Sequence, residues 1–273
     1  MLKKLVLIVI LVSCWPLNSL AEPQALSITG LLEKSGVNAQ IAATPQSIKL
    51  GLKEAVSKGA PLSGDKLALI EDAIDKAYAE NKVGGLLHQR VEHIFSDEEL
   101  QKIAAFLESP LGKRIVEAEN KLTDEKEMQK TMENAAKLVN EGNKNPARLG
   151  LIQSITEAMS TTDKNVNYAL SVALALDVAM INATPSMEMP PMEELVQVYE
   201  ANRFLMTGKV AQIVLAAGVH VYRPFSNAEL NQYLEFALSP VGNKYFTAIG
   251  DALIEILSQC GEDMGKIVSD TAI

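Results

Sequence analysis

One pattern occurs twice in the chain and constrains its fold more than any other feature. FSDEELQKIAAFLESPLG runs from Phe95 to Gly112, and FSNAELNQYLEFALSPVG runs from Phe225 to Gly242, 130 residues further on and with no gap inside the match. Two parts of a chain that share such a pattern encode the same local structure. The sequence therefore predicts one structural unit built twice.

The start of each stretch is typical of a helix N-terminus. Ser96 and Ser226 stand at the expected N-cap, and Glu99 and Glu229 follow three residues later. In such a capping box the serine side chain accepts from a free backbone N–H, and the glutamate accepts from the backbone N–H of the cap. Both stretches are therefore expected to open a helix with the same cap.

Two aromatic residues precede these caps. Phe95 falls one residue before Ser96 and Phe225 one residue before Ser226, while Leu100 and Leu230 fall at the fourth helical position. Apolar residues at those two positions can pack together as a hydrophobic staple. We therefore expect each pair to fix the direction in which the chain enters its helix.

The end of each stretch predicts a corner. Ser109-Pro110 and Ser239-Pro240 follow about three turns of helix, where proline would clash with the preceding turn. Proline suits the first position of a new helix with serine as its cap. Gly112 and Gly242 then leave room for backbones to approach closely.

A serine that occurs in both corners could also be a nucleophile. A nucleophilic serine needs a base within hydrogen-bond reach. The chain contains only His88, His93 and His220, and none has a counterpart 130 residues away. Because the serine is repeated and a base is not, we interpret the motif as structural and assign no catalytic residue.

The rest of the chain is expected to be helical. Apolar residues recur at helical spacing, as in Leu67, Ile70, Ala73, Ile74 and Ala77, and no alternating run bounded by hairpin turns competes. Breaks are expected at residues 57–65, Gly84-Gly85, 141–146 and 184–191. The predicted fold is all-α, a tandem duplication of a multi-helix unit with a capped helix, a Ser-Pro corner and a following helix.

Two segments, residues 168–183 and 210–222, are hydrophobic nearly all round. Both are shorter than the roughly 20 residues that a membrane-spanning helix needs. We expect them to be central helices covered by neighbours. No transmembrane span is therefore predicted in the mature chain.

The N-terminus has the pattern of a signal peptide. Lys3 and Lys4 precede a short apolar run, and Ser19-Leu20-Ala21 offers small residues at the cleavage positions. The expected division is a signal peptide over 1–21, one helical repeat over 22–145 and a second over 146–273. The predicted location is the periplasm, with a lipoprotein anchored through Cys14 as the alternative, because residues 11–14 resemble a lipobox.

Composition limits the partners and the redox chemistry. Cys14 and Cys260 are the only cysteines, so the mature chain has no internal disulfide available and Cys260 is expected to be buried. The net charge is −9, without a basic cluster interleaved with aromatic residues. Nucleic acid is therefore not an expected partner.

The repeated motif resembles the bacterial exported domain-of-unknown-function family 2059, through its E-L, F-x-x-S-P-x-G signature. The first copy carries this signature at Glu99, Leu100, Phe106, Ser109, Pro110 and Gly112, and a divergent second copy at Glu229, Leu230, Phe236, Ser239, Pro240 and Gly242. The resemblance implies an exported helical domain. The family has no established activity, so it supplies no catalytic residues.

A methionine-rich loop could be a metal site. Met187, Met189 and Met192 supply thioethers, which suit Cu(I). The alternative is that these side chains cover the core beneath them. Without histidine or cysteine nearby, no metal and no other cofactor is predicted.

Two functions remain open at the level of sequence. The first is a non-enzymatic binding or accessory module of the cell envelope, for a peptide, lipid or partner protein, favoured by the 48% hydrophobic content and the helical repeat. The alternative is an envelope hydrolase that uses two dispersed carboxylates across a cleft. An apolar groove would favour the first, and a carboxylate pair the second. The oligomeric state is left open.

Overall fold

The computed structural model describes residues 27–60, 62–184 and 190–271. Within these ranges every regular element is a helix and no strand occurs, which confirms the all-α prediction. The predicted signal peptide and Cys14 lie outside the described residues. Their roles stay predictions.

The two longest helices, α11 and α13, belong to the second half of the chain. The first half contains α1 (Ile28–Lys34), α2 (Val37–Ser57), α3 (Gly64–Ala77), α4 (Glu80–Val91), α5 (Asp97–Leu107), α6 (Pro110–Asn120), the 3-10 turn η1 (Lys121–Thr123), α7 (Glu125–Glu133) and α8 (Ala135–Gly142). The second contains α9 (Pro146–Ala158), α10 (Thr161–Asn182), α11 (Met192–Val221), α12 (Asn227–Leu238) and α13 (Pro240–Thr271).

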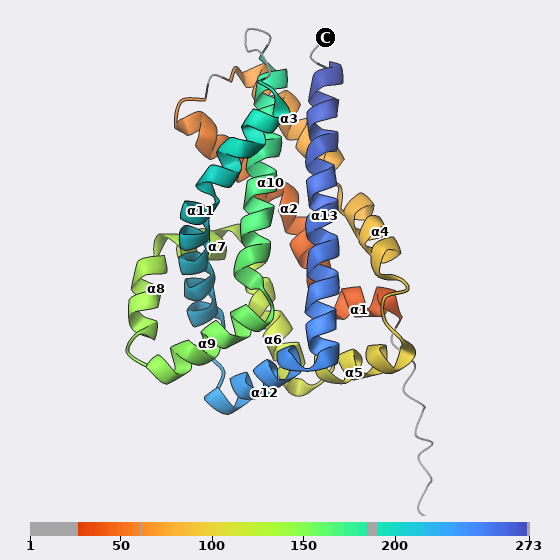
Figure 1. Ribbon diagram of the computed structural model, residues 1–273, viewed down its shortest axis with the longest axis vertical. Coiled ribbons are helices and arrows are strands. Elements are labelled where there is room, and N and C mark those ends of the chain that lie inside the picture. The colour runs from red at the N-terminus through yellow and green to blue at the C-terminus, as the bar shows by residue number, and fades with distance from the viewer. Residues whose placement is uncertain (1–26, 61, 185–189, 272–273) are drawn as a thin grey trace, which may run out of the picture.

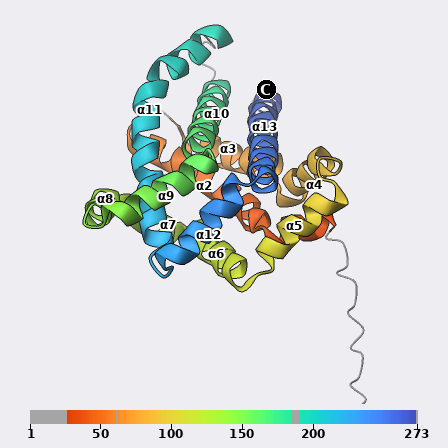
Figure 2. The same cartoon turned by 60° about the horizontal axis from the view of Figure 1, so that its bottom comes forward.

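Helices α10 and α13 lie side by side along the centre of the molecule (Figure 1). Helices α3 and α4 pack against α13, and α11 packs against α10 and α8. Helices α5, α6 and α12 cross the lower end, as Figure 2 shows. The helices that carry the repeated motif therefore meet at one end of the central pair.

The two halves of the chain share their largest hydrophobic core. Its buried members come from residues 28–107 and from residues 175–268. Cys260 is fully buried there, as the sequence predicted. A second cluster also draws on both halves, joining Ile115 of α6 to Ile155 of α9 and Leu230 of α12.

Gly84-Gly85 does not interrupt the chain, contrary to the sequence prediction, because both glycines lie inside α4. A glycine in a helix costs only about 1 kcal/mol relative to alanine. Val83, Leu87 and Val91 on the same helix are fully buried. Their burial holds α4 together across the two glycines.

The prediction that residues 210–222 form a helix buried by its neighbours is wrong in part. The segment belongs to the 30-residue helix α11, in which only Ala216, Gly218 and Val221 are buried. Ile213, Val214 and Ala217 of this segment are half-buried and line a cavity that is described below. The other expected central segment, 168–183, falls on α10, which packs against both α11 and α13.

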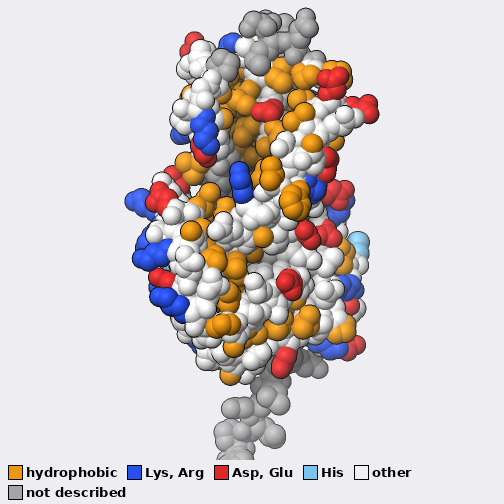
Figure 3. All heavy atoms as spheres, turned by 60° about the vertical axis from the view of Figure 1, so that its left-hand side comes forward, with side chains coloured by type: hydrophobic (Ala, Val, Ile, Leu, Met, Phe, Trp, Pro, Cys, Tyr) orange, Lys and Arg blue, Asp and Glu red, His pale blue; other side chains and the backbone are white. Residues whose placement is uncertain are grey.

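The N-terminal half of α11 carries exposed hydrophobic side chains. Phe204 is 86% exposed, Leu205 64% and Met192 49%. Figure 3 brings this side of the molecule forward and shows hydrophobic side chains gathered in its upper part. In the described part of the chain, α11 is the one helix long and apolar enough to cross a membrane. Of its apolar 18-residue stretch, 17% is buried in the protein.

Candidate functional site

Both repeated stretches begin with a capping box. At α5 the Ser96 Oγ accepts from the Glu99 backbone N–H at 3.3 Å, and the Ser96 N–H donates to Glu99 Oε2 at 2.8 Å. At α12 the same bonds join Ser226 and Glu229 at 3.2 and 2.7 Å. Phe95 with Leu100 is buried in one core cluster, and Phe225 with Leu230 in another.

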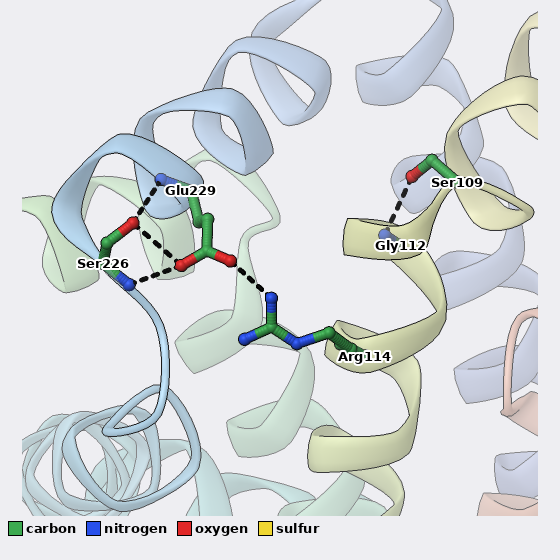
Figure 4. A network of polar contacts seen from close by, with 5 residues as sticks. All are labelled: Ser109, Gly112, Arg114, Ser226 and Glu229. Carbon is green, nitrogen blue, oxygen red and sulfur yellow. Dashed lines mark hydrogen bonds and ion pairs between the residues drawn. The ribbon is translucent and has the colours of Figure 1, made fainter.

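Both corner serines use their hydroxyls to hold the backbone. Ser109 Oγ accepts from the Gly112 N–H at 2.9 Å (Figure 4). The same hydroxyl donates to the Phe106 carbonyl at 2.6 Å. Ser239 makes the equivalent bonds to Gly242 and Phe236 at 3.1 and 2.7 Å. Each serine thus caps a new helix that begins at the following proline.

The corner glycines are required by close approach of the backbone. A Cβ atom at Gly112 would overlap the carbonyl oxygen of Phe106, and one at Gly242 would overlap that of Phe236. A carbonyl held by the corner serine cannot move away cheaply. Glycine is therefore the residue that this tight turn accepts.

The two stretches also contact each other reciprocally, which sequence reasoning did not foresee. Arg114 of α6 pairs with Glu229 in the cap of α12 (Figure 4). Lys244 of α13 pairs with Glu99 in the cap of α5 at 2.7 Å. Arg114 and Lys244 are themselves 130 residues apart. Each unit therefore places a cation on the capping box of the other.

Aromatic rings complete this reciprocal contact. Phe106 and Phe236, which occupy equivalent positions, stack with ring centroids 3.9 Å apart. The Arg114 guanidinium lies 4.8 Å from the ring centroid of Phe225, and the Lys244 ammonium 5.6 Å from that of Phe95. In the sequence, the feature that could have indicated these contacts is a basic residue two positions after each corner glycine.

A cavity of about 480 Å³ adjoins this contact and is lined by side chains of α2, α6, η1, α7, α9, α10, α11 and α13. Its lining is mostly apolar. Its apolar walls include Ile213, Val214, Ala217, Ile249, Leu253 and Leu257. Neutral polar side chains around it include Gln40, Thr44, Ser47, Thr156, Asn165, Tyr168 and Tyr245.

One carboxyl group, that of Glu119 on α6, lines the cavity. The Tyr222 hydroxyl donates to its Oε1 at 2.7 Å and the Tyr233 hydroxyl donates to the same oxygen at 2.9 Å. Burial raises the pKa of Glu119, and the two tyrosine hydrogen bonds oppose that rise. Burial likewise raises the pKa values of Tyr222 and Tyr233, so their hydroxyls stay protonated donors.

One ammonium group, that of Lys164 on α10, lines the same cavity. Its Nζ donates to the backbone carbonyls of Met159 at 3.0 Å and Phe246 at 2.9 Å. Burial lowers the pKa of Lys164, and the charge of Asp251 opposes that shift. Lys164 therefore ties the start of α10 to the start of α13.

A second hollow, of about 500 Å³, lies between α1, α2 and α4. Glu33, Glu80 and His88 line it together with Asn38 and Asn81. The described ranges contain no group of three or more His, Cys, Asp or Glu side chains that could hold a metal ion.

Of the three methionines considered as copper ligands, the structure describes one. Met192 begins α11 and is half exposed. Met187 and Met189 lie outside the described residues. The copper hypothesis therefore stays untested.

The structure is that of an all-α protein with a mostly apolar cavity lined by residues of both halves. Residues 87–141, from within α4 to within α8, match a family model described as an uncharacterized protein conserved in bacteria (DUF2059). This match contains the first motif stretch and supports the predicted family for that part of the chain. No curated protein and no solved structure gives a significant match.

Proposed function

We propose that this protein is a non-enzymatic binding protein of the bacterial cell envelope that holds a small apolar ligand in the cavity between its two halves. The observation that carries the proposal is the mostly apolar lining of that cavity. Ligand sites in proteins are typically concave and apolar, with a few placed polar groups. Tyr222, Glu119 and Lys164 are such groups here.

The size of the cavity limits the ligand. At about 30 Å³ for a water-sized group, 480 Å³ holds about sixteen such groups. A methylene group has a similar volume, so the space suits one acyl chain or a small ring system.

The lining of this cavity favours binding over the hydrolase alternative, which would need two carboxyl groups, such as Glu33 and Glu80 of the hollow between α1, α2 and α4. Hydrolysis of glycans commonly uses two carboxyl groups on opposite sides of the scissile bond. Among the described residues that line the cavity, Glu119 is the one carboxylic acid. The cavity thus offers an apolar environment with a single acid.

We further propose that the protein acts after export and that its two motif stretches arose by tandem duplication. Lys3, Lys4 and the apolar run that follows support export. The reciprocal pairs Arg114–Glu229 and Lys244–Glu99 support duplication, because equivalent positions make equivalent contacts. Mass spectrometry of the cellular protein tests export: a chain that begins at Glu22 is expected, and an uncleaved chain would contradict it.

The binding proposal is tested by titration with N-phenyl-1-naphthylamine, an uncharged dye that fluoresces in apolar surroundings. We expect saturable binding to the full mature chain. Ala217→Phe places a ring in the cavity wall and should weaken dye binding at least tenfold. Ala201→Phe, at an exposed position of the same helix, is the matched control and should leave binding unchanged. Equal binding by all three proteins would assign the dye to another surface.

A further inference from the structure

The two oxygens of Glu119 have different surroundings. Both tyrosine hydroxyls, from Tyr222 and Tyr233, donate to Oε1. No described residue donates a hydrogen bond to Oε2, the second oxygen of a side chain that lines the cavity. Oε2 is therefore the carboxyl oxygen that is left for a ligand.

The cavity holds one acidic and one basic side chain among its described lining residues, Glu119 and Lys164. Both groups already have partners in the protein: Lys164 Nζ donates to two backbone carbonyls, and Glu119 Oε1 accepts from two tyrosine hydroxyls. A charged head group would leave water for a site whose charged side chains are already paired, which is costly. A neutral head group avoids that cost.

A hydroxyl is the neutral group that fits Oε2 best. It can donate to a carboxylate oxygen, and it can accept from a protonated carboxylic acid. Tyr222 and Tyr233 hold the carboxyl group from the opposite oxygen and so fix the direction of Oε2. The polar contact is thus preorganised before a ligand enters.

We propose that the cavity binds a single-chain amphiphile with one neutral hydroxyl head group, which hydrogen-bonds to Oε2 of Glu119. This inference rests on the proposed function and specifies its ligand class. The apolar chain lies against Ile213, Val214 and Leu253, which line the cavity. Glu119 acts as a binding residue without a chemical step.

The test is displacement of N-phenyl-1-naphthylamine from the full mature chain at pH 7. The competitors share one chain length and differ in head group: dodecanol, dodecyl methyl ether, dodecylamine and dodecanoate. Dodecanol should displace the dye about fivefold to tenfold better than the ether, the gain expected from one hydrogen bond. An amine or carboxylate that displaces the dye as well as dodecanol would overturn the proposal.

Variants assign the preference to Glu119. Glu119→Leu should bring dodecanol and the ether to equal affinity, whereas Glu119→Gln keeps a polar group and should retain the preference. Glu117→Leu, at an exposed position of the same helix, is the matched control. If Glu119→Leu fails to fold, the comparison of head groups on the wild type still decides. Dye binding without a head-group preference overturns this inference and leaves the binding function standing; a chain that binds neither dye nor dodecanol overturns both.

Discussion

At the scale of single residues, two glycines and two glutamates determine how the two motif stretches turn and pack. Gly112 and Gly242 sit where a side chain would overlap a backbone carbonyl. Glu99 and Glu229 each accept a hydrogen bond in a capping box and also form an ion pair. The sequence predicted the glycines and the caps, because both follow from local backbone geometry. It did not predict the ion pairs, because their partners lie more than one hundred residues away.

Gly112→Ala should lower the free energy of unfolding by about 1–3 kcal/mol, because the new methyl group overlaps the Phe106 carbonyl. Chemical denaturation monitored by circular dichroism measures the change. Gly84→Ala is the matched control within a helix, since nothing lies within 4 Å of its added Cβ. That variant should be stabilised by up to about 1 kcal/mol. Equal effects of the two substitutions would contradict the assigned role of the corner.

Glu229 should contribute stability that depends on pH. Hydrogen bonds from the Ser226 backbone and side chain, and then from Arg114, lower the pKa of Glu229 from its ordinary 4.5 to about 2. Because the folded pKa is depressed, this contribution is complete above about pH 4.5 and is lost as the pH falls toward 2. Glu229→Gln should therefore be less stable than the wild type at pH 6, with the difference shrinking toward pH 2.

Urea denaturation at a series of pH values measures this difference. Glu235→Gln, at an exposed position of α12, is the control and should follow the wild type at every pH. A Glu229→Gln deficit that stays constant down to pH 2 would show that the carboxylate charge is not its cause.

At the scale of elements, the motif makes two corners whose following helices differ in length. The helix that begins at Pro110 has 11 residues, and the helix that begins at Pro240 has 32. The capping residues predict where each helix starts. Where each ends depends on tertiary packing, which propensity reflects only weakly. Helix α13 is long because α3, α4 and α10 pack along it.

Exchanging the charges of Arg114 and Glu229 tests whether this ion pair stabilises the contact between α6 and α12. Arg114→Glu and Glu229→Arg should each lower stability, because each brings like charges together at one site. The double variant should recover the Coulombic part of that loss but not the part due to the capping box. Stability of the four proteins is compared by thermal unfolding.

The same exchange at Lys102 and Glu98, an exposed pair within α5, is the matched control and should show weak coupling. Additive losses for Arg114 and Glu229 would mean that the two units do not depend on this pair.

At the scale of the whole molecule, the cavity is the feature that sequence reasoning could not supply. Its walls come from Thr44 on α2, Glu119 on α6, Tyr168 on α10 and Leu253 on α13, and no local spacing links them. The apolar segment 210–222 was a part of the cavity wall that the sequence singled out. It predicted a buried helix, but side chains such as Ile213 and Val214 line the cavity. Excess hydrophobicity on a helix can therefore indicate the wall of a cavity as well as a packed core.

The most direct measurement is native mass spectrometry of the protein purified from its own cell envelope, alongside Ala217→Phe and Ala201→Phe. We expect the wild type and Ala201→Phe to retain a small amphiphile, and Ala217→Phe to arrive without it because the added ring occupies its space. A ligand retained equally by all three proteins, or a wild type that arrives bare and binds no apolar dye, would contradict the claim that this cavity is the binding site.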